Sequence, residues 1–211
     1  MELSWNVFLA INSMIDGNPV RGIRFNQVRK DQEESLIEET IREMIETGIS
    51  DENGKLTVIG QVLKKNIEQY KSSESVVFIN RMRIGLVTGN RCPALIPLYE
   101  EGLLKTIDVR YVNKEIAFLE LLEVYPILKA GHIESMIERS NTETIANLIM
   151  AHGEKEMIMY AKESKTINEN YICLIDNGVM KKMDVYKKTI AEVGGGDIRY
   201  QIAGMLGLTW V

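Results

Sequence analysis

EGLLKTIDV, residues 101–109, returns as NGVMKKMDV, residues 177–185. The two copies are offset by 76 residues, from Gly102 to Gly178. They share Gly, Lys, Asp and Val, and their other apolar positions exchange only with apolar residues. Each copy follows an apolar run, at 94–99 and at 171–175. An apolar run, a two-residue turn with glycine and an alternating strand are typical of a β-hairpin, so the sequence predicts the same hairpin twice.

Helical periodicity surrounds both hairpins. Apolar spacing near 3.6 predicts helices over about 4–16, 31–47, 57–70, 113–125 and 132–150 (with a break at 140–142), and a last one carrying Ile198, Ile202, Met205 and Leu206. Asn113 is expected to cap the fourth of these helices and Pro126 to stop it. Strands are predicted over about 76–111 and 156–186.

Both halves therefore follow the order helix, hairpin, helix. We predict an α/β fold of the α+β kind, a pseudo-two-fold repeat of helix–β-hairpin–helix. Its central sheet is expected to be mostly antiparallel and flanked by two helical layers. The predicted halves are 1–130, with winged-helix-like helices and the first strand set, and 131–211, with a helix, the second strand set and the final helix. Together they are expected to form one compact domain.

The composition is that of a folded, acidic protein. The 211 residues are 45% hydrophobic and carry a net charge of −5, which argues against broad binding to nucleic acid or anionic membrane. Cys92 and Cys173 lack the spacing of a zinc site or a disulfide framework. The start of the chain carries an early acid and no basic region, and no long apolar run follows, so no signal peptide or transmembrane helix is predicted. A cytoplasmic location is expected.

Catalysis finds little support in the sequence. The two histidines, His132 and His152, have no acid or cysteine at ligand spacing, so we expect no metal, no cofactor and no catalytic residue. Asp108 and Asp184 occupy equivalent positions of the repeat, and a carboxylate pair at a pseudo-two-fold axis would be the one enzymatic alternative. Exposed carboxylates on a strand more often serve only to keep that face of the sheet hydrated.

A winged-helix transcriptional regulator is the main alternative function. The segment 44–49 followed by 54–57 has the rhythm of a recognition helix and a wing. The helix over 31–47 carries acidic residues at 31, 33, 34, 38, 39, 43 and 46 against the single Arg42. Such a surface would meet phosphates of the same sign, which weakens the case for DNA binding.

The layout resembles a known family. A short first helix, Gly48-Ile49 leading to Gly54-Lys55-Leu56-Thr57, a long helix into Tyr70 and two similar strand sets resemble the EspG chaperones of type VII (ESX) secretion, in particular their shorter Gram-positive relatives. The similarity is clearest over 3–111. It implies a quasi-two-fold fold with a central sheet, and a non-enzymatic role: a cytosolic chaperone or adaptor that holds a helical secreted protein or heterodimer.

Partner-binding residues are expected in the second half. An apolar patch rimmed by charge suits a helical partner. The residues predicted to form it are Val179, Met180 and Met183 in the hairpin and Leu208 and Trp210 in the tail.

Overall fold

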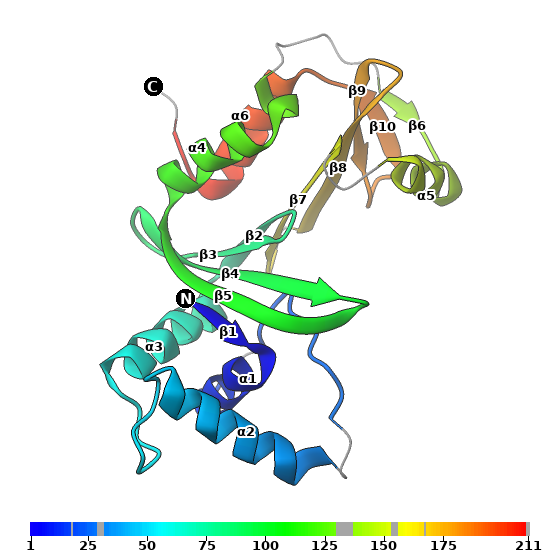
Figure 1. Ribbon diagram of the computed structural model, residues 1–211. Helices are drawn as coiled ribbons and strands as arrows, with labels where there is room; N and C mark the ends of the chain where they lie inside the picture. The colour runs from blue at the N-terminus through cyan, green and yellow to red at the C-terminus, as the bar shows by residue number, and fades with distance from the viewer. Residues whose placement is uncertain (18, 29–31, 130–136, 153–155, 167, 210–211) are drawn as a thin grey trace. The chain divides into compact units, whose positions relative to one another are not determined.

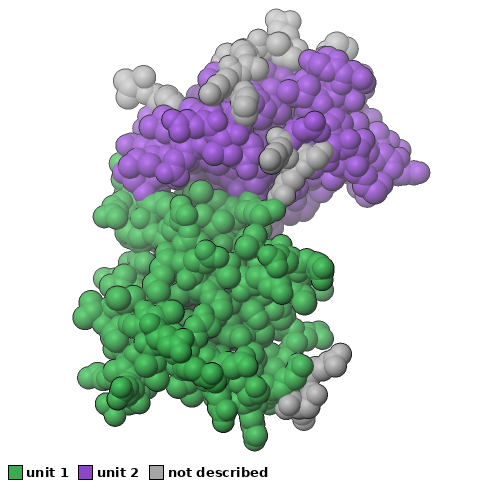
Figure 2. Space-filling model, in the orientation of Figure 1, with its two compact units in different colours: residues 1–74, 81–112 green, residues 75–80, 113–211 purple. Residues whose placement is uncertain are grey.

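The computed structural model describes the chain except for residues 18, 29–31, 130–136, 153–155, 167 and 210–211. It divides into two compact units, which are coloured separately in Figure 2. Unit 1 contains residues 1–74 and 81–112, and unit 2 contains residues 75–80 and 113–211. The halves predicted from the sequence, 1–130 and 131–211, divide the chain elsewhere, and their status as folding units stays a prediction.

Unit 1 combines three helices with four strands. Its elements are β1 (Glu2–Ser4), α1 (Trp5–Ser13), α2 (Glu33–Glu46), α3 (Val58–Ser72), β3 (Met82–Leu86), β4 (Arg91–Glu100) and β5 (Leu103–Asn113). The strand order is β1-β5-β4-β3. Helix α1 contacts both α2 and α3, and α3 packs on β3 and β4 (Figure 1). Phe8, Ile67 and Leu95 are fully buried in its core.

The helices of unit 1 begin at residues suited to that position. The Ser4 hydroxyl accepts a hydrogen bond from the backbone N–H of Val7 at 3.3 Å, and that of Thr57 accepts one from Gly60 at 3.3 Å. Both are standard N-caps. Gly60 is required for a second reason, because a Cβ there would lie 2.2 Å from the carbonyl oxygen of Ile49.

Unit 2 combines three helices with six strands. Its elements are β2 (Ser75–Ile79), α4 (Lys114–Val124), a 3-10 helix (Pro126–Lys129), β6 (Ile137–Arg139), α5 (Thr142–Ala151), β7 (Met157–Ser164), β8 (Asn168–Asp176), β9 (Val179–Asp184), β10 (Thr189–Glu192) and α6 (Gly195–Leu206). The strand order is β2-β7-β8-β9-β10-β6. Strand β2 pairs antiparallel with β7, with Phe78 opposite Ala161. Helix α6 contacts the 3-10 segment that follows α4.

Both predicted hairpins are present. Each turns through two residues of positive φ: Glu101 (51°) and Gly102 (79°) between β4 and β5, and Asn177 (51°) and Gly178 (80°) between β8 and β9. Positive φ at both central positions defines a type I′ turn, which matches the twist of antiparallel strands. The predicted α+β class with a large antiparallel sheet is confirmed, with six helices and ten strands among the described residues. The pseudo-two-fold repeat stays a prediction.

The structure departs from the predicted elements in three places. Residues 137–139, predicted as helix, form strand β6 because they pair with β10. Strand β10 itself was not predicted. Strand β1 was not predicted either. Helix α6 begins at Gly195, where the Asp197 carboxylate accepts a hydrogen bond from the Gly194 N–H at 2.9 Å. Residues 132–136 of the predicted helix lie outside the described part of the chain.

Candidate protein-interaction surfaces

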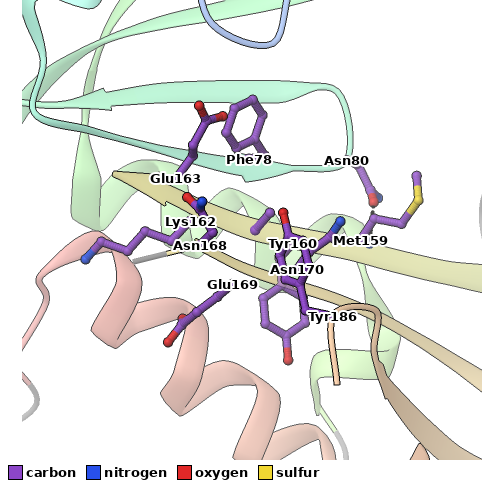
Figure 3. Close-up of a pocket in the computed structure, with 11 residues that line it drawn as sticks. Phe78, Asn80, Met159, Tyr160, Lys162, Glu163, Asn168, Glu169, Asn170 and Tyr186 are labelled. Atoms are coloured by element: carbon purple, nitrogen blue, oxygen red, sulfur yellow. Dashed lines mark hydrogen bonds between the residues drawn. The ribbon is translucent and has the colours of Figure 1, made fainter. Parts of the chain in front are cut away.

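A recess of about 470 Å³ lies over strands β2, β7 and β8 of unit 2 (Figure 3). Phe78, Ala161 and Asn170 form one cross-strand row beneath it, since Ala161 is paired with both of the others. Met159 and Tyr186 also line it. We call this region the unit 2 recess.

Strand alternation explains why the recess is open. Successive side chains of a strand point to opposite faces of the sheet, so Met157, Met159 and Ala161 share one face. Further along that face, α5 covers an apolar cluster made of Ile145, Met157, Ile172, Leu174 and Met183. Beyond α5 the same face is exposed to solvent, with Met159 37% exposed and Tyr186 61% exposed. The recess is therefore the uncovered continuation of a packed apolar face.

The edge of the recess is polar and hydrogen-bonded. Asn80 and Met159 bond reciprocally: the Asn80 N–H donates to the Met159 carbonyl at 2.7 Å, and the Met159 N–H donates to Asn80 Oδ1 at 2.7 Å. Glu163 shares the face of Ala161 and adds a negative charge, whereas Lys162 and Glu169 pair with each other and alternate to the opposite face of the sheet (Figure 3). A recess with Phe78 and Ala161 in its floor and a polar edge is suited to holding apolar side chains of a partner.

Helix α4 presents a second apolar surface in unit 2. Asn113 caps it as predicted, accepting hydrogen bonds from the N–H groups of Glu115 and Ile116 at 2.8 and 3.3 Å. The inner face buries Ala117, Phe118 and Leu121. Three of the outer side chains are also apolar: Ile116 and Leu119 are each 56% exposed and Val124 is 65% exposed. We call these three residues the α4 outer face.

Large apolar side chains of a surface helix normally lie on its inner face. Helix α4 has them on both sides, since Ile116, Leu119 and Val124 are exposed on the same side as Glu115, Glu120 and Glu123. The sequence contained this signal, because the apolar residues of 114–124 do not keep to one helical stripe. The predicted partner-binding residues lie in the second hairpin and the tail and do not include the α4 outer face.

The predicted partner-binding residues differ in accessibility. Met183 is fully buried in the cluster beneath α5, and Met180 is 8% exposed. Val179 is half-buried on the same hairpin. Leu208 follows the end of α6, where its N–H donates to the Ala203 carbonyl at 2.9 Å. Trp210 lies outside the described residues. Partner binding by these five residues stays a prediction, and the structure gives Met183 a core role that alternation along β9 explains.

The two repeat-equivalent carboxylates have separate structural partners. Asp108 binds the Met1 amino group at 2.9 Å and Arg110 Nε at 2.5 Å. Partial burial acts to raise the pKa of Asp108, but the hydrogen bonds from Met1 and Arg110 outweigh it and the net pKa is lowered. Asp184 accepts hydrogen bonds from the N–H groups of Tyr186 and Lys187 at 3.1 and 2.9 Å. A general acid needs the opposite shift from that of Asp108.

The described histidine has a structural environment as well. His152 Nδ1 lies 2.8 Å from the Leu148 carbonyl oxygen, and its Nε2 lies 2.9 Å from that of Ile175. Only a protonated ring donates from both nitrogens. The hydrogen bond to Leu148 is the main reason that the pKa of His152 is raised. His132 lies outside the described residues.

Among the described residues, no group of three or more His, Cys, Asp or Glu side chains is placed to hold a metal ion. Cys92 and Cys173 are both buried and free. Burial raises the pKa of Cys173 to about 12, so it is not a ready nucleophile. None of the described helices is long and apolar enough to cross a membrane.

A solved structure has the same fold as this chain. The chain has the fold of the Mycobacterium tuberculosis type VII secretion system chaperone EspG5, whose structure was solved in complex with the PE25-PPE41 dimer. The match covers 100% of this chain and 97% of EspG5, with a TM-score of 0.54 and 11% sequence identity. No curated protein matches the sequence.

The family assignment rests on the sequence. A family described as "Domain of unknown function (DUF5081)" matches residues 8–136. This is more than half of the 211 residues, and the chain belongs to that family.

Proposed function

We propose that the protein is a cytoplasmic chaperone or adaptor of type VII secretion, which binds a helical secreted protein or heterodimer and performs no chemistry. Its fold likeness to EspG5 extends over nearly the whole of both chains. That neighbour was captured with a PE25-PPE41 dimer, which supports a partner of the same kind here. The surfaces of unit 2 supply apolar contact area, and the proposal needs no cofactor.

The α4 outer face is the observation that carries the proposal. Three large apolar side chains on one short helix stay more than half exposed. Ile116 and Leu119 are neighbours at i and i+3 and lie beside the exposed Glu120 and Glu123, and an apolar pair edged by charge is suited to a protein-binding site. A helical partner that covered Ile116 and Leu119 would gain on the order of 25 cal/mol for each Å² of apolar surface removed from water. The unit 2 recess and the half-buried Val179 and Leu208 are further proposed contacts.

Affinity purification of the tagged protein from its native cytosol, with mass spectrometry of what co-elutes, tests the function. We expect a small helical secreted protein at near-equal stoichiometry. The double variant Ile116→Glu/Leu119→Glu should lose it, because two charges would be buried without partners at the contact. Val58→Glu is the matched control, since Val58 is 80% exposed on α3 of unit 1 and a Glu in a first helical turn is tolerated.

Three further outcomes are informative. Loss of the partner by Ala161→Arg would add the unit 2 recess to the interface. Truncation after Gly207 tests Leu208 and Trp210, and unchanged capture by the folded truncation would remove both from it. Recovery of DNA in place of a protein, with binding that falls as salt rises, would contradict the chaperone and favour the regulator.

A further inference from the structure

A groove of about 470 Å³ lies between α1 and α2 of unit 1. Leu9 and Met14 line it from the α1 side, and Leu36, Ile37 and Ile41 line it from α2. Three of these are exposed in spite of their size: Met14 at 44%, Ile37 at 54% and Ile41 at 50%. We call it the α1/α2 groove.

Helical spacing produces the groove. Asn6, Leu9, Ala10 and Ser13 follow one another at i, i+3, i+4 and i+7 and form one stripe along α1. Ala10 and Ser13 have small side chains, so the surface of α1 is recessed at these two positions. On α2 the positions 36, 37, 40, 41 and 44 form the facing stripe. The two helices are in contact, yet the shallow stripe leaves Ile37 and Ile41 with part of their surface uncovered.

An unsatisfied polar atom lies among these apolar residues. Asn6 lines the groove, and its Oδ1 is buried without a hydrogen-bond partner among the described residues. A buried acceptor without a donor costs free energy comparable to that of a lost hydrogen bond. A small rotation of the Asn6 side chain would offer this acceptor to a donor on an occupant of the groove.

The charge that α2 carries beside the groove is mostly negative. Helix α2 carries Glu33, Glu34, Glu38, Glu39, Glu43 and Glu46 against Arg42. Glu34 and Glu38 flank the exposed side of the stripe that holds Ile37 and Ile41, by the helical period. Both are exposed. A second copy of this chain would bring the same acids together, so self-association through α2 is disfavoured, and an occupant with positive charge is favoured.

We propose that the α1/α2 groove is a second docking site, which binds the apolar face of a cationic amphipathic helix. The apolar face would cover Met14, Ile37 and Ile41, a donor side chain would reach Asn6, and lysines or arginines at the edges would face Glu34 and Glu38. The 14 residues of α2 span about 21 Å at 1.5 Å per residue, so the fitting ligand has about four helical turns. This proposal uses unit 1 alone and does not rest on the proposed function.

Two synthetic peptides test the site without knowledge of the natural ligand. One is a fluorescent 14-residue amphipathic helix of Leu and Lys, and the other has the same pattern with Glu in place of Lys. Fluorescence anisotropy against the full chain should show the Leu/Lys peptide binding at least tenfold more tightly than the Leu/Glu peptide. Affinity for the Leu/Lys peptide should fall as salt rises, because exposed charges are screened.

Matched variants separate the groove from general attraction to an acidic protein. Ile37→Ser/Ile41→Ser should weaken the Leu/Lys peptide at least tenfold, whereas Val58→Ser/Val62→Ser, on the exposed surface of α3, should change its affinity less than twofold. Glu34→Gln/Glu38→Gln should weaken binding and reduce its salt dependence.

The proposal is overturned if both peptides bind equally, or if the α3 pair weakens binding as much as the α2 pair does. Sedimentation gives a third way to overturn it: a dimer of the free chain that Ile37→Ser/Ile41→Ser dissociates would make a second copy the occupant. Circular dichroism of every variant confirms that a lost signal is not lost folding.

Discussion

The hairpin of β4 and β5 in unit 1 and that of β8 and β9 in unit 2 turn in the same way with different residues. Glu101 and Asn177 both have φ of 51°, and the glycines after them have φ of 79° and 80°. The inward positions agree as well: Ile107 and Met183 are both fully buried. Apolar alternation and one glycine therefore fix a hairpin whether or not its other residues are the same.

The polar positions of the two hairpins, in contrast, have different interaction partners. Asp108 binds the chain's amino group and Arg110, whereas the equivalent Asp184 is 8% exposed and accepts backbone N–H groups of the following turn. An aspartate at the same position of the hairpin therefore accepts hydrogen bonds from different donors in the two units.

Shortening the inward side chains should have the largest effect. Ile107→Ala and Met183→Ala are each expected to lower the free energy of unfolding by about 2–5 kcal/mol, because each leaves a cavity in a packed core. Urea denaturation measures the loss, and hydrogen exchange should place it in unit 1 for Ile107→Ala and in unit 2 for Met183→Ala. A loss below about 1 kcal/mol for Met183→Ala would show that its side chain is not anchored beneath α5 and would return it to the predicted interface.

Adding a Cβ to the turn glycines should have a smaller and equal effect in both hairpins. Gly102→Ala and Gly178→Ala have no atom within 4 Å to clash with, so the cost is the left-handed backbone alone, about 1–2 kcal/mol each. The same denaturation experiment measures it. Costs that differ by more than about 1 kcal/mol would mean that the two turns are not equivalent.

Exchanging the residues that precede the two turn glycines should change the stability of the protein in opposite directions. Glu101→Asn is expected to stabilise the protein by about 0.5 kcal/mol and Asn177→Glu to destabilise it by a similar amount, because Asn adopts positive φ more readily than Glu does. Thermal melts of the two variants and of the double exchange measure the effects. Effects of the same sign in both single variants would contradict the backbone explanation.

Changes of pH should affect the surroundings of the two hairpins in opposite directions. The lowered pKa of Asp108 means that its contribution is present above its unfolded pKa of about 3.9 and is lost as the pH falls through the folded value. The raised pKa of His152, which binds the Ile175 carbonyl of β8, means that its contribution is full below about 6.5 and is lost as the pH rises through the folded value.

Two variants measure these contributions by thermal melts across pH. Asp108→Asn should destabilise at pH 7, by under about 1 kcal/mol because the pair is partly exposed, and the difference from wild type should shrink toward pH 2. His152→Ala should lower the melting temperature more at pH 5.5 than at pH 8. A His152→Ala effect that grows with pH would show that the neutral ring is the form that the fold stabilises.

The sequence predicted most of the local structure because local patterns carry it. The helices at α1, α2, α3 and α6 follow apolar periodicity, and Asn113 caps α4 as its side chain predicts. Strand β6 could not be found this way, since its three residues are all exposed and are extended only because β10 pairs with them. The pairing of β2 with β7 joins residues more than 80 positions apart, and no local pattern records it.

The features that form the candidate surfaces also differ in whether the sequence predicts them. Residue order within single elements predicts the two hairpins, the helical stripes, the acidic α2 and the apolar residues on both sides of α4. Which of these apolar residues are covered depends on the elements that pack against them in the folded chain. Met183 is buried in the cluster that includes Ile145 of α5, whereas Met159 on the same face lies outside that cluster and is 37% exposed. Burial depends on what packs from elsewhere in the chain, so the exposed Ile116, Leu119, Ile37 and Ile41 became candidates for partner contacts only in the folded protein.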